Sequence, residues 1–320
     1  MTRSGSDWRD VLSLRSPTEE RNPRTAMIDQ LPTREVVSLV LAEDRAVLTA
    51  VEAAAEQVGA LAEAGVAAVR RGGRIHYVGS GTSGRLGVLD AVELRPTYDV
   101  GEETVLPHLA GGPSAMTRAV EGAEDDVDAG RAVTAEVAAG DLVVGLSASG
   151  RTPFVAGALA AARELGAVTA LVSTNPAAPL AAGVDIAVLL DTGPEVVTGS
   201  TRMKAATAQK LVLNAFSTAV MVRLGKTYSN LMIEVLPTND KLRARTVRML
   251  VQATGAPPDR CAEVLEEARG RVRTALVALL AGCSADEAAR AVEAHPPDAD
   301  RSGDPAGVRA AVAALGVVAR

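Results

Sequence analysis

The stretch Val78-Gly-Ser-Gly-Thr-Ser-Gly-Arg-Leu86 decides how the chain folds. It follows the apolar run 74–78, which is typical of a buried strand, and it leads into 86–93, which has the pattern of a helix. Glycines at such a junction let the backbone approach a ligand, and the first amides of the helix attract negative charge. The sequence therefore predicts an anion-binding turn at the tip of this strand.

The same arrangement recurs further along the chain. The strand-like run 141–146 is followed by Ser147-Ala-Ser-Gly-Arg-Thr-Pro153, so the triplet Ser-Gly-Arg occurs at 83–85 and again at 149–151. A third hydroxyl-rich turn, 198–202, opens another helix. Since each turn offers hydroxyls and helix amides, the three together predict a site that surrounds one phosphorylated ligand.

Strands and helices alternate through the middle of the chain, which predicts an α/β fold with a parallel sheet covered by helices on both faces. The five predicted strands lie near 74–79, 103–107, 141–147, 167–173 and 184–190. In such sheets, ligands bind beyond the carboxyl ends of the strands, where both Ser-Gly-Arg turns fall. The predicted domains are an arm with a short helix (1–45), the α/β domain (46–240) and a small helical domain (241–320).

Outside the sheet, the patterns predict simpler elements. Residues 1–30 are polar and proline-containing, which predicts an extended arm with little structure of its own. A short helix is expected over 33–41, and one long alanine-rich helix over 45–71. Three short helices are expected within 243–294, followed by a flexible loop over 295–305.

Composition narrows the range of functions. The chain has 320 residues and a net charge of −6, which gives no general affinity for nucleic acid or anionic lipid. Aromatic residues make up only 2% of the chain, too few for base-stacking platforms. The amino terminus lacks a signal core, and no uncharged apolar run reaches roughly 18 residues. We expect a cytoplasmic protein without nucleic-acid or membrane partners.

Histidine and cysteine residues give no sign of a metal site or a nucleophile. His108 and His295 have no partners at metal-binding spacing, and His76, within a predicted strand, is expected to be a packed core residue. Cys261 and Cys283 form neither a disulfide framework nor a metal motif, and we expect both to be reduced.

Three observations allow more than one interpretation. The glycines of 79–84 also satisfy the dinucleotide fingerprint, although the hydroxyls in both turns argue against a pyrophosphate. The serines at 83, 147 and 149 would equally serve as simple helix caps. Glu93 and the acidic segment 119–126 are each either catalytic or merely solvated.

Several longer motifs of the sequence resemble those of a known family. They are Gly79–Asp90, Glu121–Asp125, Ser149–Pro153, Glu195–Lys204 and Thr207–Asn214. Together they resemble the N-acetylmuramic acid 6-phosphate etherase family, and the likeness extends from about Thr18 to Arg245. The resemblance implies the sugar isomerase (SIS) fold, a homodimer, and no metal or organic cofactor. The family is also related to the glucokinase regulatory protein, which binds sugar phosphates without converting them.

The implied reaction is cleavage of the ether that joins D-lactate to C3 of N-acetylmuramic acid 6-phosphate, which yields N-acetylglucosamine 6-phosphate. Two alternatives stay open, namely a non-catalytic sugar-phosphate-binding regulator and a sugar-phosphate isomerase. The resemblance places the two catalytic carboxylates on Glu93 and Glu124. It places substrate contacts on Thr82, Ser83, Glu121, Ser147, Ser149, Thr152 and Ser200. The sequence departs from the family pattern around Glu93, where 90–97 reads Asp-Ala-Val-Glu-Leu-Arg-Pro-Thr.

The position of Glu93 raises a geometric difficulty. In one unbroken helix, Ser83 and Glu93 would lie about 15 Å apart along the axis. A hexose phosphate spans roughly half that distance from phosphorus to C3. Either the helix ends early, or Glu93 serves the site of a neighbouring subunit. We favour the second arrangement, a dimer with a shared site.

Overall fold

The computed structural model describes residues 16–235 and 239–316, which form two compact units. The first unit comprises the residues up to 92 together with 102–217, and the second comprises 93–101 and the residues from 218 onward. Within the described residues, no helix is long and apolar enough to cross a membrane.

The first unit is built on five parallel strands, β1 (Ile75–Gly79), β2 (Val105–Leu109), β3 (Leu142–Leu146), β4 (Val168–Ser173) and β5 (Ile186–Leu189). Its longer helices are α2 (Thr33–Glu43), α3 (Arg45–Ala53), α4 (Ala55–Arg70), α5 (Gly81–Tyr98), α6 (Val127–Ala132), α7 (Pro153–Glu164) and α8 (Lys204–Arg223), of which α5 and α8 continue into the second unit. This α/β architecture confirms the predicted fold class.

The strand order is β2-β1-β3-β4-β5. The chain therefore proceeds to one side after β1 and to the other side from β3 onward. At such a reversal the connections leave a crevice at the carboxyl ends of the two central strands, and this crevice is the usual ligand site of open α/β sheets. Here β1 and β3 lie next to each other at the reversal, and each is followed by one of the two Ser-Gly-Arg turns.

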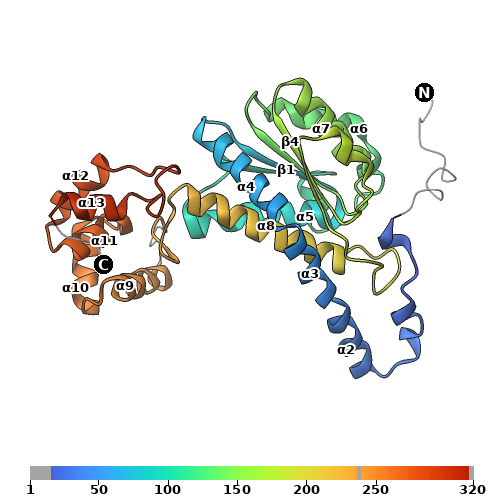
Figure 1. Cartoon of the computed structure of the whole chain (residues 1–320), viewed down its shortest axis with the longest axis horizontal. Helices are drawn as coiled ribbons and strands as arrows, with labels where there is room; N and C mark the ends of the chain where they lie inside the picture. The colour runs from blue at the N-terminus through green and yellow to red at the C-terminus, as the bar shows by residue number, and fades with distance from the viewer. Residues whose placement is uncertain (1–15, 236–238, 317–320) are drawn as a thin grey trace. The chain divides into compact units, whose positions relative to one another are not determined.

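Helices cover both faces of the sheet (Figure 1). On one face, Val78, Val143 and Leu171 pack against α7 in a cluster of buried apolar side chains. On the other face, the ring of Tyr77 meets Phe216 of α8 edge-on, with centroids 6.2 Å apart. The Tyr77 hydroxyl donates a hydrogen bond of 2.9 Å to Asp90 of α5. The two-sided burial explains why the strands read as continuous apolar runs.

Helix α5 crosses β1 at very short range. A Cβ on Gly84 would lie 2.4 Å from the carbonyl oxygen of Gly79 and 2.5 Å from Leu109 Cδ1. A Cβ on Gly79 would lie 2.8 Å from the Gly84 backbone. Only glycine at both positions lets the helix begin directly against the strand end.

The second unit has its own apolar core around Leu250, Val264 and Leu276. Its elements are the hairpin β6 (Thr227–Tyr228) and β7 (Leu231–Met232), followed by α9 (Asp240–Thr254), α10 (Pro258–Glu267), α11 (Val272–Ala281), α12 (Ala285–Ala294) and α13 (Val308–Ala314). Four helices, rather than the predicted three, span 240–294. Beyond the break expected at 255–258, two further boundaries arise at Gly270 and Gly282, which take left-handed conformations at φ 75° and 66°.

Three other predictions are corrected. The single helix expected over 45–71 is divided at Ala54, where the backbone leaves the helical range at φ −95° and ψ 10° despite the high helix propensity of alanine. Strand β2 lies two residues later than expected, because an edge strand tolerates Pro107. Residues 16–30 are not a structureless arm but form three short 3₁₀ helices, η1 (Pro17–Glu19), η2 (Pro23–Thr25) and η3 (Ile28–Gln30). Residues 1–15 of that prediction lie outside the described part.

The close crossing at Gly84 gives a stability prediction. Gly84→Ala should lower the free energy of unfolding by about 1–3 kcal/mol, because the added methyl group meets backbone atoms that cannot move aside. The matched control is Gly59→Ala in α4, where an added Cβ has nothing within 4 Å. That change should raise stability by roughly 0.5–1 kcal/mol. Urea unfolding measures both; equal stability of Gly84→Ala and the natural protein would contradict the prediction.

Candidate functional site

A pocket of about 710 Å³ opens at the carboxyl ends of β1 and β3. The residues that line it include Ser80, Thr82, Ser83, Ser149, Arg151, Thr152, Gly199, Thr201, Glu19, Glu124 and Asp125. All three hydroxyl-rich turns of the sequence contribute to it. Their predicted convergence on one site is therefore confirmed.

The first wall is the start of α5. Gly81 adopts a positive φ of 52°, and the helix begins there, so that Thr82 and Ser83 belong to its first turn. The first amides of a helix have no partners within it, and they present partial positive charge to a ligand. Arg85 does not line this wall, because its Nε donates to the Ala115 carbonyl at 2.8 Å.

The second wall is the turn between β3 and α7. Ser147 is 2% exposed and lies beneath the pocket surface. Its Oγ accepts a hydrogen bond from the Gly150 amide at 3.0 Å and lies 2.8 Å from Thr152 Oγ1. Ser147 thus supports the turn, while Ser149 and Thr152 line the cavity. Asn175 holds the turn from behind, since its Nδ2 donates to the Ser149 carbonyl at 3.0 Å.

The third wall precedes α8. Gly199 and Thr201 line the pocket, whereas Ser200, which lies between them, does not. Glu195 is fully buried and caps the helix, because its carboxylate accepts the amides of Lys204 and Ala205, both at 2.9 Å. Burial raises the pKa of Glu195, while these two amides oppose that shift.

A buried ionic network stands behind this third wall. Lys204 is 0% exposed, and its Nζ donates to Glu43 at 3.2 Å. The Glu43 carboxylate also accepts bidentate hydrogen bonds from the Arg24 guanidinium and a 2.8 Å hydrogen bond from Asn22 Nδ2. The hydrogen bonds from Arg24 lower the pKa of Glu43 to about 2 despite its burial. The network links the end of α2 to the start of α8.

The pocket holds carboxylates beside its hydroxyls. Glu124 and Asp125, in the short 3₁₀ helix η5 (Ala123–Asp125), line it together with Glu19. Glu121 is exposed and does not line it. Neither does Glu93, which is exposed on α5, about 18 Å along the axis from Gly81. Since α5 is unbroken to Tyr98, the helix does not end early, and the geometric difficulty persists.

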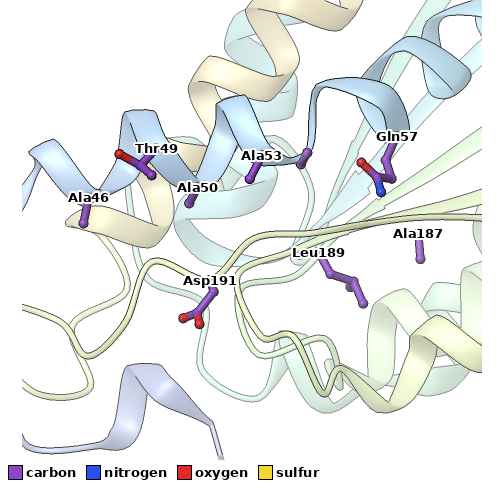
Figure 2. A pocket seen from close by; sticks show the side chains of 9 residues that line it. Ala46, Thr49, Ala50, Ala53, Gln57, Ala187, Leu189 and Asp191 are labelled. Atoms are coloured by element: carbon purple, nitrogen blue, oxygen red, sulfur yellow. The ribbon is translucent and has the colours of Figure 1, made fainter.

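Other candidate features lie apart from this pocket. His76 is 0% exposed, as predicted, and its ring forms hydrogen bonds with His108 at 2.9 Å and with Asp141, which precedes β3, at 3.1 Å. Among the described residues, no cluster of three or more histidine, cysteine or acidic side chains is suited to a metal ion. A second hollow of about 620 Å³ lies between α3–α4 and the edge strand β5 (Figure 2). Alanine side chains make up most of its walls, and neither arginine nor lysine is among its lining residues.

The arrangement suits a phosphorylated polar ligand. Helix amides, hydroxyls and Arg151 can bind a phosphoryl group, and the carboxylates can accept hydrogen bonds or exchange protons with the rest of the ligand. Sequence reasoning missed Glu19 and Asp125 and gave no role to Ser80 and Arg151. Ser80 and Arg151 belong to the two Ser-Gly-Arg turns, so the turn motifs could have identified them. Glu19 lies in a polar segment without any recognisable pattern.

Comparison with known proteins agrees with this picture. Residues 57–163 match the glucokinase regulatory protein N-terminal SIS domain, and residues 115–219 match the SIS domain. A phosphoheptose isomerase from Neisseria gonorrhoeae aligns at 22% identity with a TM-score of 0.44, over 59% of this chain and 99% of that one. The two domain matches identify the fold of this chain as the SIS fold.

Full-length relatives identify the family within this class. A Thermobifida fusca protein named N-acetylmuramic acid 6-phosphate etherase is 55% identical over 267 residues, which cover 83% of this chain and 88% of the relative. A protein of the same name from Mycolicibacterium smegmatis is 50% identical, over 86% of this chain and 93% of the relative. The chain belongs to the N-acetylmuramic acid 6-phosphate etherase family.

The ionic network behind the third wall predicts a pH dependence. The pKa of Glu43 is about 2 in the folded chain, against an ordinary value of 4.5. The stabilisation is therefore fully present above about pH 4.5 and is lost as the pH falls towards 2. Glu43→Gln should cost about 3 kcal/mol of unfolding free energy at neutral pH, and this difference from the natural protein should shrink over the same interval.

The measurement is urea unfolding between pH 7 and pH 2. Glu35→Gln is the matched control, because Glu35 is exposed on the same helix, α2. Its pH profile should run parallel to that of the natural protein. A Glu43→Gln profile that also stays parallel down to pH 2 would contradict the prediction.

Proposed function

We propose that the chain is a lyase that uses water to cleave the D-lactyl ether of N-acetylmuramic acid 6-phosphate, releasing D-lactate and N-acetylglucosamine 6-phosphate. The observation that carries the proposal is the identity of 47–55% with relatives of that name along most of both chains. The pocket supports it, because it combines a phosphate-binding end with carboxylates. The enzyme would act in the cytoplasm, in amino-sugar catabolism and peptidoglycan recycling.

The phosphoryl group supplies binding energy away from the reacting carbons. Thr82 and Ser83 on one turn, and Ser149 and Thr152 on the other, would donate to its oxygens, with Ser147 holding the second turn in place. The family resemblance also implies sugar contacts from Ser200 and Glu121, although neither residue lines the pocket of this chain. Fixing the phosphate in this way orients C2 and C3 relative to the carboxylates and so lowers the entropic part of the barrier.

The chemistry needs a base and an acid. In the ring-opened aldehyde the C2 proton is acidic, and Glu124 would remove it. The electron pair left on C2 forms the C2–C3 double bond, the C3–O bond breaks, and the lactate oxygen takes a proton from Glu93. Glu93 then deprotonates a water molecule that adds to C3, and Glu124 returns a proton to C2. The residue types do not fix which glutamate is base and which is acid.

A shared site would reconcile this mechanism with the position of Glu93. The continuity of α5 supports an arrangement in which Glu93 acts in the pocket of a second subunit. We therefore propose a homodimer in which each site combines the phosphate-binding turns and Glu124 of one subunit with Glu93 of the other.

The first test is lactate release from N-acetylmuramic acid 6-phosphate, with the unphosphorylated sugar as control substrate. The natural protein should release lactate only from the phosphorylated sugar. Glu124→Gln should lower turnover by at least about 100-fold and abolish exchange of the C2 hydrogen with solvent deuterium. Asp128→Asn, a nearby exposed carboxylate outside the pocket, should behave like the natural protein.

Other outcomes of this test would overturn the proposal. Tight binding of the substrate without any lactate release would point to a regulator. Formation of a ketose phosphate would point to an isomerase. Substantial C2 exchange in Glu124→Gln would refute the assignment of the base.

The second test concerns the shared site. Glu93→Ala and Ser149→Ala subunits should each be inactive alone, but a mixed dimer would contain one intact site. Co-expression of the two should restore about a quarter of natural activity, since half the dimers are mixed and each has one working site of two. Co-expression of two differently tagged Glu93→Ala chains is the control. If mass spectrometry verifies that mixed dimers are present and no activity is recovered, the shared site is excluded.

A further inference from the structure

The segment 16–25 is attached to the third wall of the pocket by backbone and side-chain contacts. The Gly199 amide donates to the Thr18 carbonyl at 2.9 Å, and Thr25 Oγ1 donates to the Val196 carbonyl at 2.8 Å. Asn22 Nδ2 donates to the Pro194 carbonyl at 3.2 Å. Polar groups buried in this way are costly unless they are paired, so their pairing fixes the path of the segment.

Three polar residues that anchor the segment are buried, whereas Glu19 is exposed. Thr18 is 0% exposed, Asn22 is 1% exposed and Thr25 is 5% exposed, whereas Glu19 is exposed and lines the pocket. Its Oε2 lies 3.4 Å from the position that a Cβ on Gly199 would occupy. The segment therefore holds its one pocket-lining carboxylate against the turn that precedes α8.

The Glu19 carboxylate differs from the other acidic groups around the third wall. Among the described residues it makes no side-chain hydrogen bond or ion pair, unlike Glu43 and Glu195, which are bound within the fold. An ionised carboxylate only accepts hydrogen bonds, and it repels a phosphoryl group. Its partner in an occupied pocket must be a neutral donor, which in an amino-sugar phosphate means a hydroxyl or the amide N–H.

We propose that Glu19 is a substrate-contacting residue that accepts a hydrogen bond from a hydroxyl or amide N–H of the amino sugar. This inference rests on the proposed function of the same pocket. Glu19 recognises the sugar, whereas the serine-bearing turns recognise the phosphate. The amino-terminal segment is thus part of the specificity of the site.

The test compares Glu19→Ala with Glu20→Ala, the adjacent exposed glutamate that does not line the pocket. Calorimetry measures the binding of N-acetylglucosamine 6-phosphate and, separately, of inorganic phosphate. Glu19→Ala should weaken sugar-phosphate binding roughly 10- to 100-fold, the value of a hydrogen bond to a charged group. It should leave phosphate binding unchanged or tighter, because a negative charge is removed. In turnover, KM should rise while kcat changes by less than about threefold.

The two ligands distinguish recognition from damage to the pocket. Weaker binding of both would mean that the change disturbs the walls, and equal binding of the sugar phosphate by Glu19→Ala and Glu20→Ala would mean that Glu19 contacts nothing. A collapse of kcat at constant KM would make Glu19 a participant in the transition state only. Each of these results overturns the proposal. If the natural protein released no lactate, the proposed function would fail, while the binding comparison would still test Glu19.

Discussion

The constraint on which the site depends is the close crossing of α5 over the end of β1. Because Gly79 and Gly84 have no side chains, the helix begins at the strand tip, and its free amides face the crevice beside β3. The turn after β3 meets a similar restriction, since a Cβ on Gly150 would lie 2.2 Å from the Cβ of Ala178. Two helix starts are thus brought to one side of the sheet reversal, where their dipoles add for an anion.

The third wall is held in place by buried charged groups rather than by close backbone packing. Lys204, Glu43 and Glu195 are almost fully buried, and removing such groups from water costs several kcal/mol each unless they are paired. Here the pairing is extensive: Glu43 binds three donors, and Glu195 binds two helix amides. Compared with well-packed apolar side chains of similar volume, such a network adds little net stability, but removal of one member is costly because it leaves the others unpaired. It fixes the turn 194–201 relative to α2 and to the segment that carries Glu19.

How much of this could be predicted from the sequence depended on whether a feature was local. The strands and both Ser-Gly-Arg turns were recognisable, because apolar runs and glycines act on their own neighbours. The break at Ala54 was not, since alanine favours a helix and the adjacent residues 52–56 contain no glycine or proline. The ordered path of 16–30 was missed for the same reason. Its hydrogen bonds reach residues more than 170 positions away, such as Pro194 and Val196, which leave no local pattern.

In the proposed site, the acidic groups come from other segments of the chain than the groups that bind the phosphate. In the function proposed above, phosphate recognition uses the strand tips and the helix starts that follow them. The carboxylates come from elsewhere: Glu124 from a short 3₁₀ helix after β2, Glu19 from the amino-terminal segment, and Glu93 from the far part of α5. Changes in these outer segments can alter what happens at C2 and C3 without disturbing the phosphate-binding turns. One sheet can therefore support a regulator, an isomerase or a lyase, and we propose that in this chain the outer segments supply the acids that a lyase needs.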